Sequence, residues 1–307
     1  MHRSSPILAA SALLLLAACS PSERVPAASA VTDPSSRAVT EPGVVRLFGT
    51  PQRLGDGVVR TYIDVDAKDG RTPREIGVSI SESAMQGLPA AAAPQDEHAS
   101  MSQHQHGTVY ILDLPGGNPT PYKFVQFDWN PGGHHPYEIY GLDHFDFHFY
   151  NVPLDVRNSI VTTDPQYMQK AASLPAPQFR MPWYIDAGTA SQAPQGAVSV
   201  ERMGLHWLDI RSPELQKLTG HPELWKPFDK TFFYGSWDGQ FIFDEPMITK
   251  DYLTAKRDGA GVQDELVAIP TPGRRAVPGF YPSAYRITYD AVDKEYRVAL
   301  TQLGWRE

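Results

Sequence analysis

The stretch from His144 to Tyr150, His-Phe-Asp-Phe-His-Phe-Tyr, decides the fold of this chain. Its residues alternate strictly, with two imidazoles and a carboxylate in one set of positions and three phenylalanines in the other. A period of two is typical of a β-strand, whose successive side chains point to opposite faces. A helix would also bring His144 and His148 together, but it would spread the phenylalanines around its circumference. The alternation therefore predicts a strand with an aromatic face in the core and a polar face at a site.

The rest of the chain indicates a β-rich globular fold. Gly and Pro, at 24 and 28 of 307 residues, favour many turns and short strands. Residues 231–248 form the clearest hairpin, because Asp238-Gly239 between two apolar runs favours a type I′ turn. Two strands at 285–289 and 296–303 close the chain. We expect an all-β fold, a barrel or sandwich of antiparallel strands with a few short helices.

Capping signals place the short helices. Asp164 followed by Pro165 predicts a helix that reaches residue 173, and Ser212 predicts a short one after it. Thr249 predicts a helix that ends at Arg257. Residues 174–199 are proline-rich and are predicted to form a loop.

The N-terminus has the pattern of an export signal. An apolar run at residues 7–18 follows His2 and Arg3 and is too short to span a bilayer as a mature helix. It ends in Leu-Ala-Ala-Cys19, which resembles a bacterial lipobox, in which the signal peptide is cut before a cysteine that is then lipidated. Cys19 is the only cysteine, so no disulfide partner competes for it. The alternative is an ordinary secretory signal with an incidental cysteine.

These features divide the chain into three parts. We expect a signal peptide at residues 1–18, a lipidated cysteine with a flexible tether at 19–42, and a single β-rich domain at 43–307. Acyl chains would provide the membrane anchor in the bacterial cell envelope. Ser20 rather than Asp follows the cysteine, which by resemblance to lipoproteins of Gram-negative bacteria indicates the outer membrane.

Charge and motifs narrow the function classes. The net charge is −8, and loss of Arg3 with the signal peptide leaves 26 basic against 35 acidic residues. No basic stripe is present, which argues against nucleic acid as a partner. The sequence lacks a Gly-x-Ser-x-Gly elbow, a P-loop and a dinucleotide fingerprint.

Histidines and carboxylates near the central strand predict one divalent-metal site. The candidate ligands are His144, Asp146, His148, His206 and Glu245, with His134 and His135 in reserve. Imidazole suits Zn, Fe, Mn, Ni or Cu, and a carboxylate shifts the preference toward harder ions. A further segment with His98, Met101, His104 and His106 is read as a solvated loop or a loose metal collector.

Strand geometry limits how these ligands combine. On a straight strand His144 and His148 lie ~13 Å apart, too far to share one metal, whereas neighbours at i and i+2 lie ~7 Å apart. A bulge would relax this limit. Two alternatives remain open. The histidines of a non-catalytic ligand-binding or envelope-stress scaffold would form a structural network. A metal-independent hydrolase would need a nucleophile that the sequence does not identify.

Several strings together resemble an uncharacterised bacterial family of exported β proteins, over roughly residues 43–304. They are Gly-His-His-Pro (133–136), His-Phe-Asp-Phe-His-Phe-Tyr (144–150), Met-Gly-Leu-His-Trp (203–207), Phe-Tyr-Gly-Ser-Trp-Asp-Gly (233–239), Phe-Asp-Glu-Pro-Met-Ile-Thr (243–249) and Pro-Gly-Phe-Tyr-Pro-Ser-Ala-Tyr (278–285). The family includes a stress-regulated thermophile protein that assembles into a ring. The resemblance implies a β fold and a homo-oligomer, and it implies no activity, substrate or small-molecule ligand.

Overall fold

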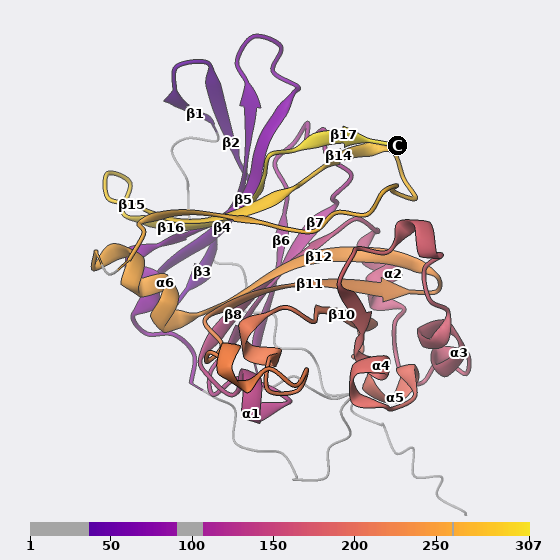
Figure 1. The fold of residues 1–307 in the computed structure, drawn as a ribbon. Helices are drawn as coiled ribbons and strands as arrows, with labels where there is room; N and C mark the ends of the chain where they lie inside the picture. The colour runs from indigo at the N-terminus through magenta and orange to yellow at the C-terminus, as the bar shows by residue number, and fades with distance from the viewer. Residues whose placement is uncertain (1–36, 91–106, 260) are drawn as a thin grey trace, which may run out of the picture.

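The chain folds as an antiparallel β-sandwich with a few short helices (Figure 1). The computed structural model describes residues 37–90, 107–259 and 261–307. Within these ranges, no helix is long and apolar enough to cross a membrane. The expected signal peptide, Cys19 and most of the expected tether lie outside the described residues, as does the His98–His106 segment with its histidines and methionine.

The first sheet has eight strands. Its order is β1 (Arg37–Glu41), β2 (Val44–Phe48), β4 (Gly57–Asp66), β5 (Pro73–Ser81), β16 (Glu295–Thr301), β15 (Ala284–Asp290) and β13 (Asp264–Ala268), with β3 (Gln52–Leu54) also paired to β4. The closing hairpin predicted from the sequence is β15 and β16. Because β1 pairs with β2, the sheet takes in residues 37–41, which the sequence had assigned to the tether.

The second sheet has seven strands and carries the central stretch. Its order is β6 (Thr108–Asp113), β7 (Phe124–Asn130), β8 (His144–Tyr150), β12 (Gln240–Thr249), β11 (Lys230–Trp237), β10 (Leu205–Asp209) and β9 (Tyr184–Asp186). A small third sheet pairs β14 (Gly279–Tyr281) with β17 (Gly304–Arg306). Both large sheets are open at their edges, so the sandwich is the observed one of the two expected arrangements.

The aromatic face of β8 lies in the core between the sheets. Phe145, Phe147 and Phe149 are fully buried and belong to the same cluster as Ile63 and Val298 of the first sheet. The strand predicted from the alternation is therefore confirmed, including the side that faces inward. The other face of β8 is turned away from the first sheet.

The hairpin of β11 and β12 also follows the prediction. Asp238 and Gly239 have φ angles of 48° and 78°, and a positive φ at both central positions defines the type I′ turn. Register shifts between Gly235 and Ser236, where the hairpin has a bulge.

The helices match the capping signals in part. Thr249 caps α6 (Lys250–Arg257), accepting a hydrogen bond from the Tyr252 backbone N–H at 3.2 Å, as predicted. The helix expected from Asp164 begins later, as α3 (Tyr167–Ala172), because Asp164 binds Lys170 at 2.7 Å and shapes the preceding turn. Ser212 makes no capping bond to the 3-10 turn η4 (Pro213–Leu215).

The prediction that residues 174–199 form a loop was wrong. The segment contains η3 (Pro177–Phe179), β9, α4 (Ala187–Ser191) and α5 (Gln195–Val198). Asp186 ends β9 and caps α4, accepting from the Thr189 backbone N–H at 2.9 Å. A three-residue edge strand and two single-turn helices are too short to show a period, which is why the sequence pattern missed them.

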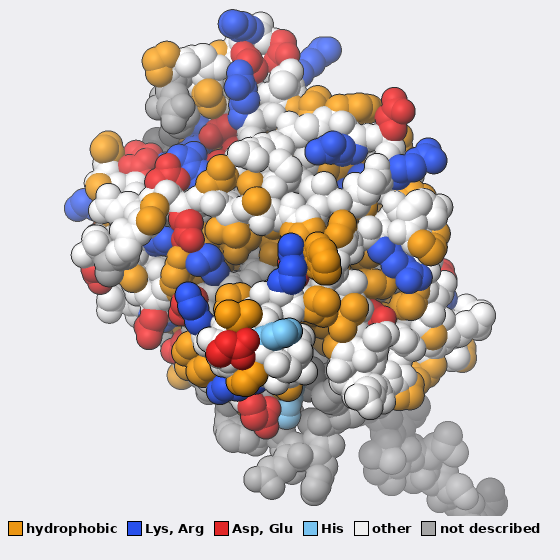
Figure 2. Space-filling model, viewed as in Figure 1, with side chains coloured by type: hydrophobic (Ala, Val, Ile, Leu, Met, Phe, Trp, Pro, Cys, Tyr) orange, Lys and Arg blue, Asp and Glu red, His pale blue; other side chains and the backbone are white. Residues whose placement is uncertain are grey.

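Short elements cover the outer face of the second sheet. Besides α3, α4 and α5, they include α1 (Tyr137–Tyr140), α2 (Leu154–Asn158) and η4. A further 3-10 turn, η5 (Pro222–Leu224), follows η4 in the chain, and η1 (Glu82–Met85) lies beside the first sheet. Figure 2 shows basic and acidic side chains interspersed over the visible surface, with apolar patches between them.

Candidate functional site

Two neighbouring strands form a polar floor on the outer face of the second sheet. On β8 the row is His144, Asp146 and His148. On β7 it is Asn130, Asp128 and Gln126, which pair with those three residues in the same order. All six side chains are buried. Sequence reasoning missed the row on β7, although Gln126-Phe-Asp-Trp-Asn130 alternates in the same way as the central stretch.

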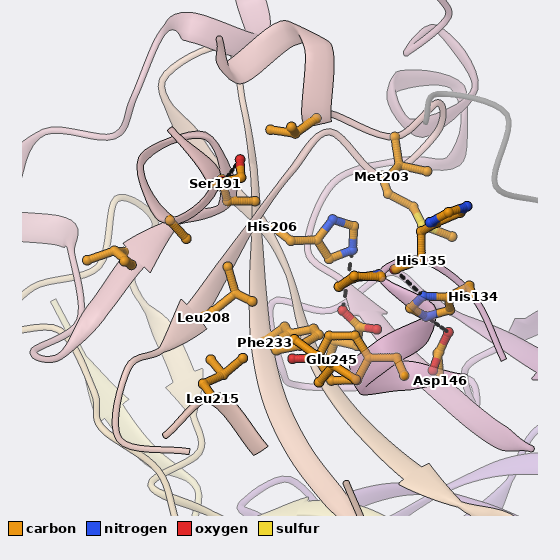
Figure 3. A pocket seen from close by; sticks show the side chains of 18 of the residues that line it. His134, His135, Asp146, Ser191, Met203, His206, Leu208, Leu215, Phe233 and Glu245 are labelled. Carbon is orange, nitrogen blue, oxygen red and sulfur yellow. Dashed lines mark hydrogen bonds and ion pairs between the residues drawn. The ribbon is translucent and has the colours of Figure 1, made fainter. Parts of the chain in front are cut away.

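A cavity of about 810 Å³ lies over this floor (Figure 3). Its walls come from α1, α4, α5, η4 and the outer faces of β9, β10 and β11. The apolar wall residues include Ile139, Ile185, Val198, Met203, Leu208, Leu215 and Phe233. Asp128, Asp146 and Glu245 lie at its polar end with the histidines, so the cavity combines an apolar body with one ionisable region.

The first cluster on the floor consists of His134, His144 and Asp146. Asp146 lies between the two imidazoles, with His144 Nε2 at 3.3 Å from Oδ1 and His134 Nε2 at 3.7 Å from Oδ2. Candidate ligand atoms of all three residues lie within 4.8 Å of one another. We call this group the His134 triplet.

The surroundings of the His134 triplet orient its ligand atoms. His144 Nδ1 is 2.6 Å from the Leu142 carbonyl, and His134 Nδ1 is 2.8 Å from the His135 carbonyl. Carbonyls only accept, so each Nδ1 donates to its carbonyl, which fixes the ring with Nε2 turned toward Asp146. Asn130 Nδ2 donates to Asp146 Oδ2 at 2.7 Å. Second partners of this kind hold metal-binding histidines and carboxylates in place.

The second cluster draws one residue from each of three strands. His148 comes from β8, Glu245 from β12 and His206 from β10. His148 Nε2 is 3.3 Å from Glu245 Oε1, and His206 Nε2 is 3.6 Å from Glu245 Oε2. The candidate ligand atoms again lie within 4.8 Å of one another. We call this group the His148 triplet.

Asp128 supports the His148 triplet from below. Its Oδ2 is 3.4 Å from His148 Nδ1 and accepts from Gln126 Nε2 at 2.8 Å. Gln126 in turn accepts from Arg157 Nε at 2.9 Å, and Arg157 is almost fully buried. A polar chain therefore runs from Arg157 to the triplet.

Burial perturbs the titration of these groups. Burial, with the neighbouring Asp146, raises the pKa of Asp128 to about 8, and burial also raises the pKa of Glu245 well above its usual value. Burial lowers the pKa of His148 to about 4. Burial opposes the ionisation of Asp146, but the adjacent His144 and His134 bring its pKa below the ordinary range.

Several of these buried atoms face one another without a hydrogen bond. They are His144 Nε2, Asp146 Oδ1, both ring nitrogens of His148 and Glu245 Oε2. His144 Nε2 lies 3.3 Å from Asp146 Oδ1, and His148 Nε2 lies 3.3 Å from Glu245 Oε1, so these atoms are close to each other without forming hydrogen bonds. A buried polar atom left without a partner costs about 1–3 kcal/mol, so this concentration calls for an explanation.

The two triplets could each hold a metal ion. In a tetrahedral site with bonds of about 2.1 Å, neighbouring ligand atoms lie about 3.4 Å apart and do not bond to each other. The nitrogen–oxygen separations of 3.3–3.7 Å in the two triplets are close to that value.

The structure thus divides the predicted ligands between two places. His144 and His148, which strand geometry kept apart, belong to different triplets. His134 from the reserve joins the first, whereas His135 is exposed and its ring lies against Tyr137, with centroids 4.3 Å apart. The sequence could not show this division, because it depends on the order of β8, β12 and β10 in the sheet.

Comparison with family models, with curated proteins and with solved structures gave no match to this chain.

Proposed function

We propose that this protein binds divalent metal ions on the polar floor of the cavity, one at each triplet. The observation that carries the proposal is the set of buried nitrogen and oxygen atoms that face one another at about the edge length of a metal's ligand shell without hydrogen bonds. A structural network would instead pair such atoms, since buried polar groups are nearly always hydrogen-bonded.

The ligand atoms of each triplet narrow the range of metals that could bind there. Each triplet supplies two imidazoles and one carboxylate, which suit Zn and Fe(II), with Mn, Ni and Cu as competitors. Three protein ligands leave at least one position free, as in catalytic rather than structural zinc sites. Residues of both triplets line the cavity, so that position faces a space that a small molecule can enter.

Metal content of the full chain tests the proposal. Elemental mass spectrometry after loading with Zn, Fe, Mn, Ni or Cu should find two ions per wild-type chain. The double variants His134→Ala/His144→Ala and His148→Ala/His206→Ala should each retain one. His221→Ala is the matched control, because His221 is exposed and lies outside the cavity. Absence of metal from the loaded wild type, or full metal in both double variants, would contradict the proposal.

The two alternatives have different support. Aromatic rings pack around His148, with the Phe243 centroid at 4.9 Å, which favours some structural contribution from this residue. A structural role alone predicts destabilisation of His148→Ala without any metal in the wild type. A hydrolase is less well supported, because the hydroxyls of Thr189, Ser191 and Thr219 in the cavity donate to groups outside the triplets.

We further propose that Cys19 carries the lipid that anchors the protein in the bacterial cell envelope, at the outer membrane. The support is the Leu-Ala-Ala-Cys string and the single cysteine. Mass spectrometry of the N-terminal peptide should find diacylglycerol on the cysteine, and Cys19→Ser should release the protein from membranes. The homo-oligomer implied by the family resemblance is a separate proposal, which light scattering of the purified chain tests.

A further inference from the structure

The cavity has the size and the lining of a site for an amphipathic molecule. Its volume of about 810 Å³ falls in the range of small-molecule pockets. The walls are mainly aliphatic, and Leu208, Leu215 and Phe233 lie on one side with Met203 on another (Figure 3). Leu218, at 74% exposure, also lines the cavity and marks where it meets solvent.

Several of these apolar side chains are only half-buried. Ile185, Met203, Leu208 and Ile210 all keep contact with the open space. Apolar surface of this kind is stabilised when an apolar body covers it. Aliphatic side chains predominate among the wall residues, so an alkyl chain matches them more closely than a flat aromatic body.

The polar floor of the cavity determines which polar head group an amphipathic ligand could carry. Asp128, Asp146 and Glu245 bring three carboxyl groups to it, and among the charged residues that contact them directly or through Gln126, Arg157 is the permanent cation. Without metal, these carboxyl groups offer an anionic head no coordination position. Two divalent ions would exceed the carboxylate charge and leave the floor positive, with free coordination positions toward the cavity.

We infer that the cavity binds an aliphatic carboxylate, with its alkyl chain along the apolar walls and its carboxylate on the metal-bearing floor. This inference rests on the proposed metal binding, because the metals provide the charge and the coordination positions that hold the head.

Calorimetry with a series of linear acids tests the inference. Hexanoate, octanoate and decanoate are titrated into the zinc-loaded full chain and into the same protein after chelation. Each added methylene should tighten binding by about fourfold, the effect of burying one CH₂ group. Chelation should abolish decanoate binding, and decylamine should then bind better than decanoate. Affinity that does not rise with chain length, or that is equal with and without zinc, would overturn the inference.

Two cavity-filling variants test whether the alkyl chain of the ligand lies in the cavity. Leu208→Trp and Met203→Trp fill the apolar part from two sides and should each weaken decanoate binding by tenfold or more, as about 1.4 kcal/mol of lost contact would. Leu224→Trp is the matched control, because Leu224 is 57% exposed and lies outside the lining. If neither filled variant binds decanoate less tightly than the control, the ligand does not lie in this cavity.

Metal content measured in the same samples separates the two proposals. If the wild type holds zinc but does not bind decanoate, the inferred carboxylate ligand is contradicted and the proposed metal binding is not. A wild type that holds no metal contradicts the proposed function, and the ligand inference then fails with it.

Discussion

Among individual side chains, Asp128 connects the two triplets most directly. It lies opposite Asp146 in the register of β7 and β8, and its carboxylate reaches His148 Nδ1 at 3.4 Å. A metal on His148 Nε2 would leave the proton on Nδ1. An ionised Asp128 can then accept a hydrogen bond from that Nδ1–H. Asp128 therefore changes from a costly buried acid to a useful acceptor when metal binds.

The isosteric change Asp128→Asn tests this role. It keeps the shape but removes the charge beside His148, so metal affinity of the His148 triplet should fall by about 10–100-fold. Competition with a chromophoric chelator, in a background of His134→Ala/His144→Ala, measures that site alone. Asp113→Asn, at an exposed carboxylate on β6, is the control and should leave affinity unchanged. Equal affinities for the two variants would exclude a supporting role for Asp128.

Stability of the metal-free protein should fall as pH rises from 6.5 to 8. Folding raises the pKa of Asp128 to about 8 and also raises that of Glu245, so the folded state binds more protons than the unfolded state in this window. His148, whose pKa folding lowers from 6.5 to about 4, is partly protonated only in the unfolded state near pH 6.5, so it adds a smaller opposing slope that fades as pH rises toward 8. One such carboxyl contributes up to about 1.4 kcal/mol per pH unit. Urea unfolding in the presence of chelator measures the trend, which should be shallower in Asp128→Asn; stability that rises with pH would refute it.

Among the secondary-structure elements, sequence patterns revealed those whose signal is local. The alternation in β8 gave both the strand and its inward face, and Asp238-Gly239 gave the type I′ turn. The edge strand β9 and the single-turn helices escaped, because three to five residues carry no measurable period. The sequence also could not predict which histidines share a carboxylate. Glu245 lies close to both His206 and His148 only because of the order of the strands in the sheet.

Gly235 in β11 tests whether the sheet positions the His148 triplet. It pairs with His206 on one side and Phe243 on the other, and a Cβ there would lie 2.1 Å from the Phe243 ring. That ring packs on His148 and His206 with centroid distances of 4.9 and 5.4 Å. Gly235→Ala should therefore cost about 1–3 kcal/mol of stability through overpacking.

The same variant should weaken metal binding at the His148 triplet and leave the His134 triplet unchanged. Gly116→Ala is the control, because no atom lies within 4 Å of the added methyl group and its backbone needs no positive φ. Thermal melts and site-specific chelator competition measure both effects. Unaltered binding at both triplets would show that the ring does not position the histidines.

In the molecule as a whole, the apolar core that stabilises the fold and the candidate site lie in different places. The main core lies between the two sheets, whereas the cavity lies on the outer face of the second sheet beside two smaller apolar clusters. The sandwich should therefore fold without metal, and metal should add stability only by binding the folded state.

Chelation should lower the melting temperature without loss of β structure. Free metal at 100 times its dissociation constant contributes about 2.7 kcal/mol, which corresponds to a shift of several degrees. Calorimetry gives the shift, and far-UV circular dichroism at 25 °C should stay the same. Unfolding at room temperature on chelation would mean that the metals are part of the fold itself.

The spacing of His144, Asp146 and His148 along one strand also determines how two bound ions would interact magnetically. Residues two positions apart on a strand are separated by about 7 Å, whereas ions joined by a single bridging oxygen lie about 3.5–4 Å apart. Copper(II) placed at both triplets would therefore behave as two separate spins, coupled through space by their dipoles and not by exchange through a shared ligand. Electron paramagnetic resonance of the doubly loaded protein in frozen solution should show two copper signals, each broadened by the dipole of its neighbour.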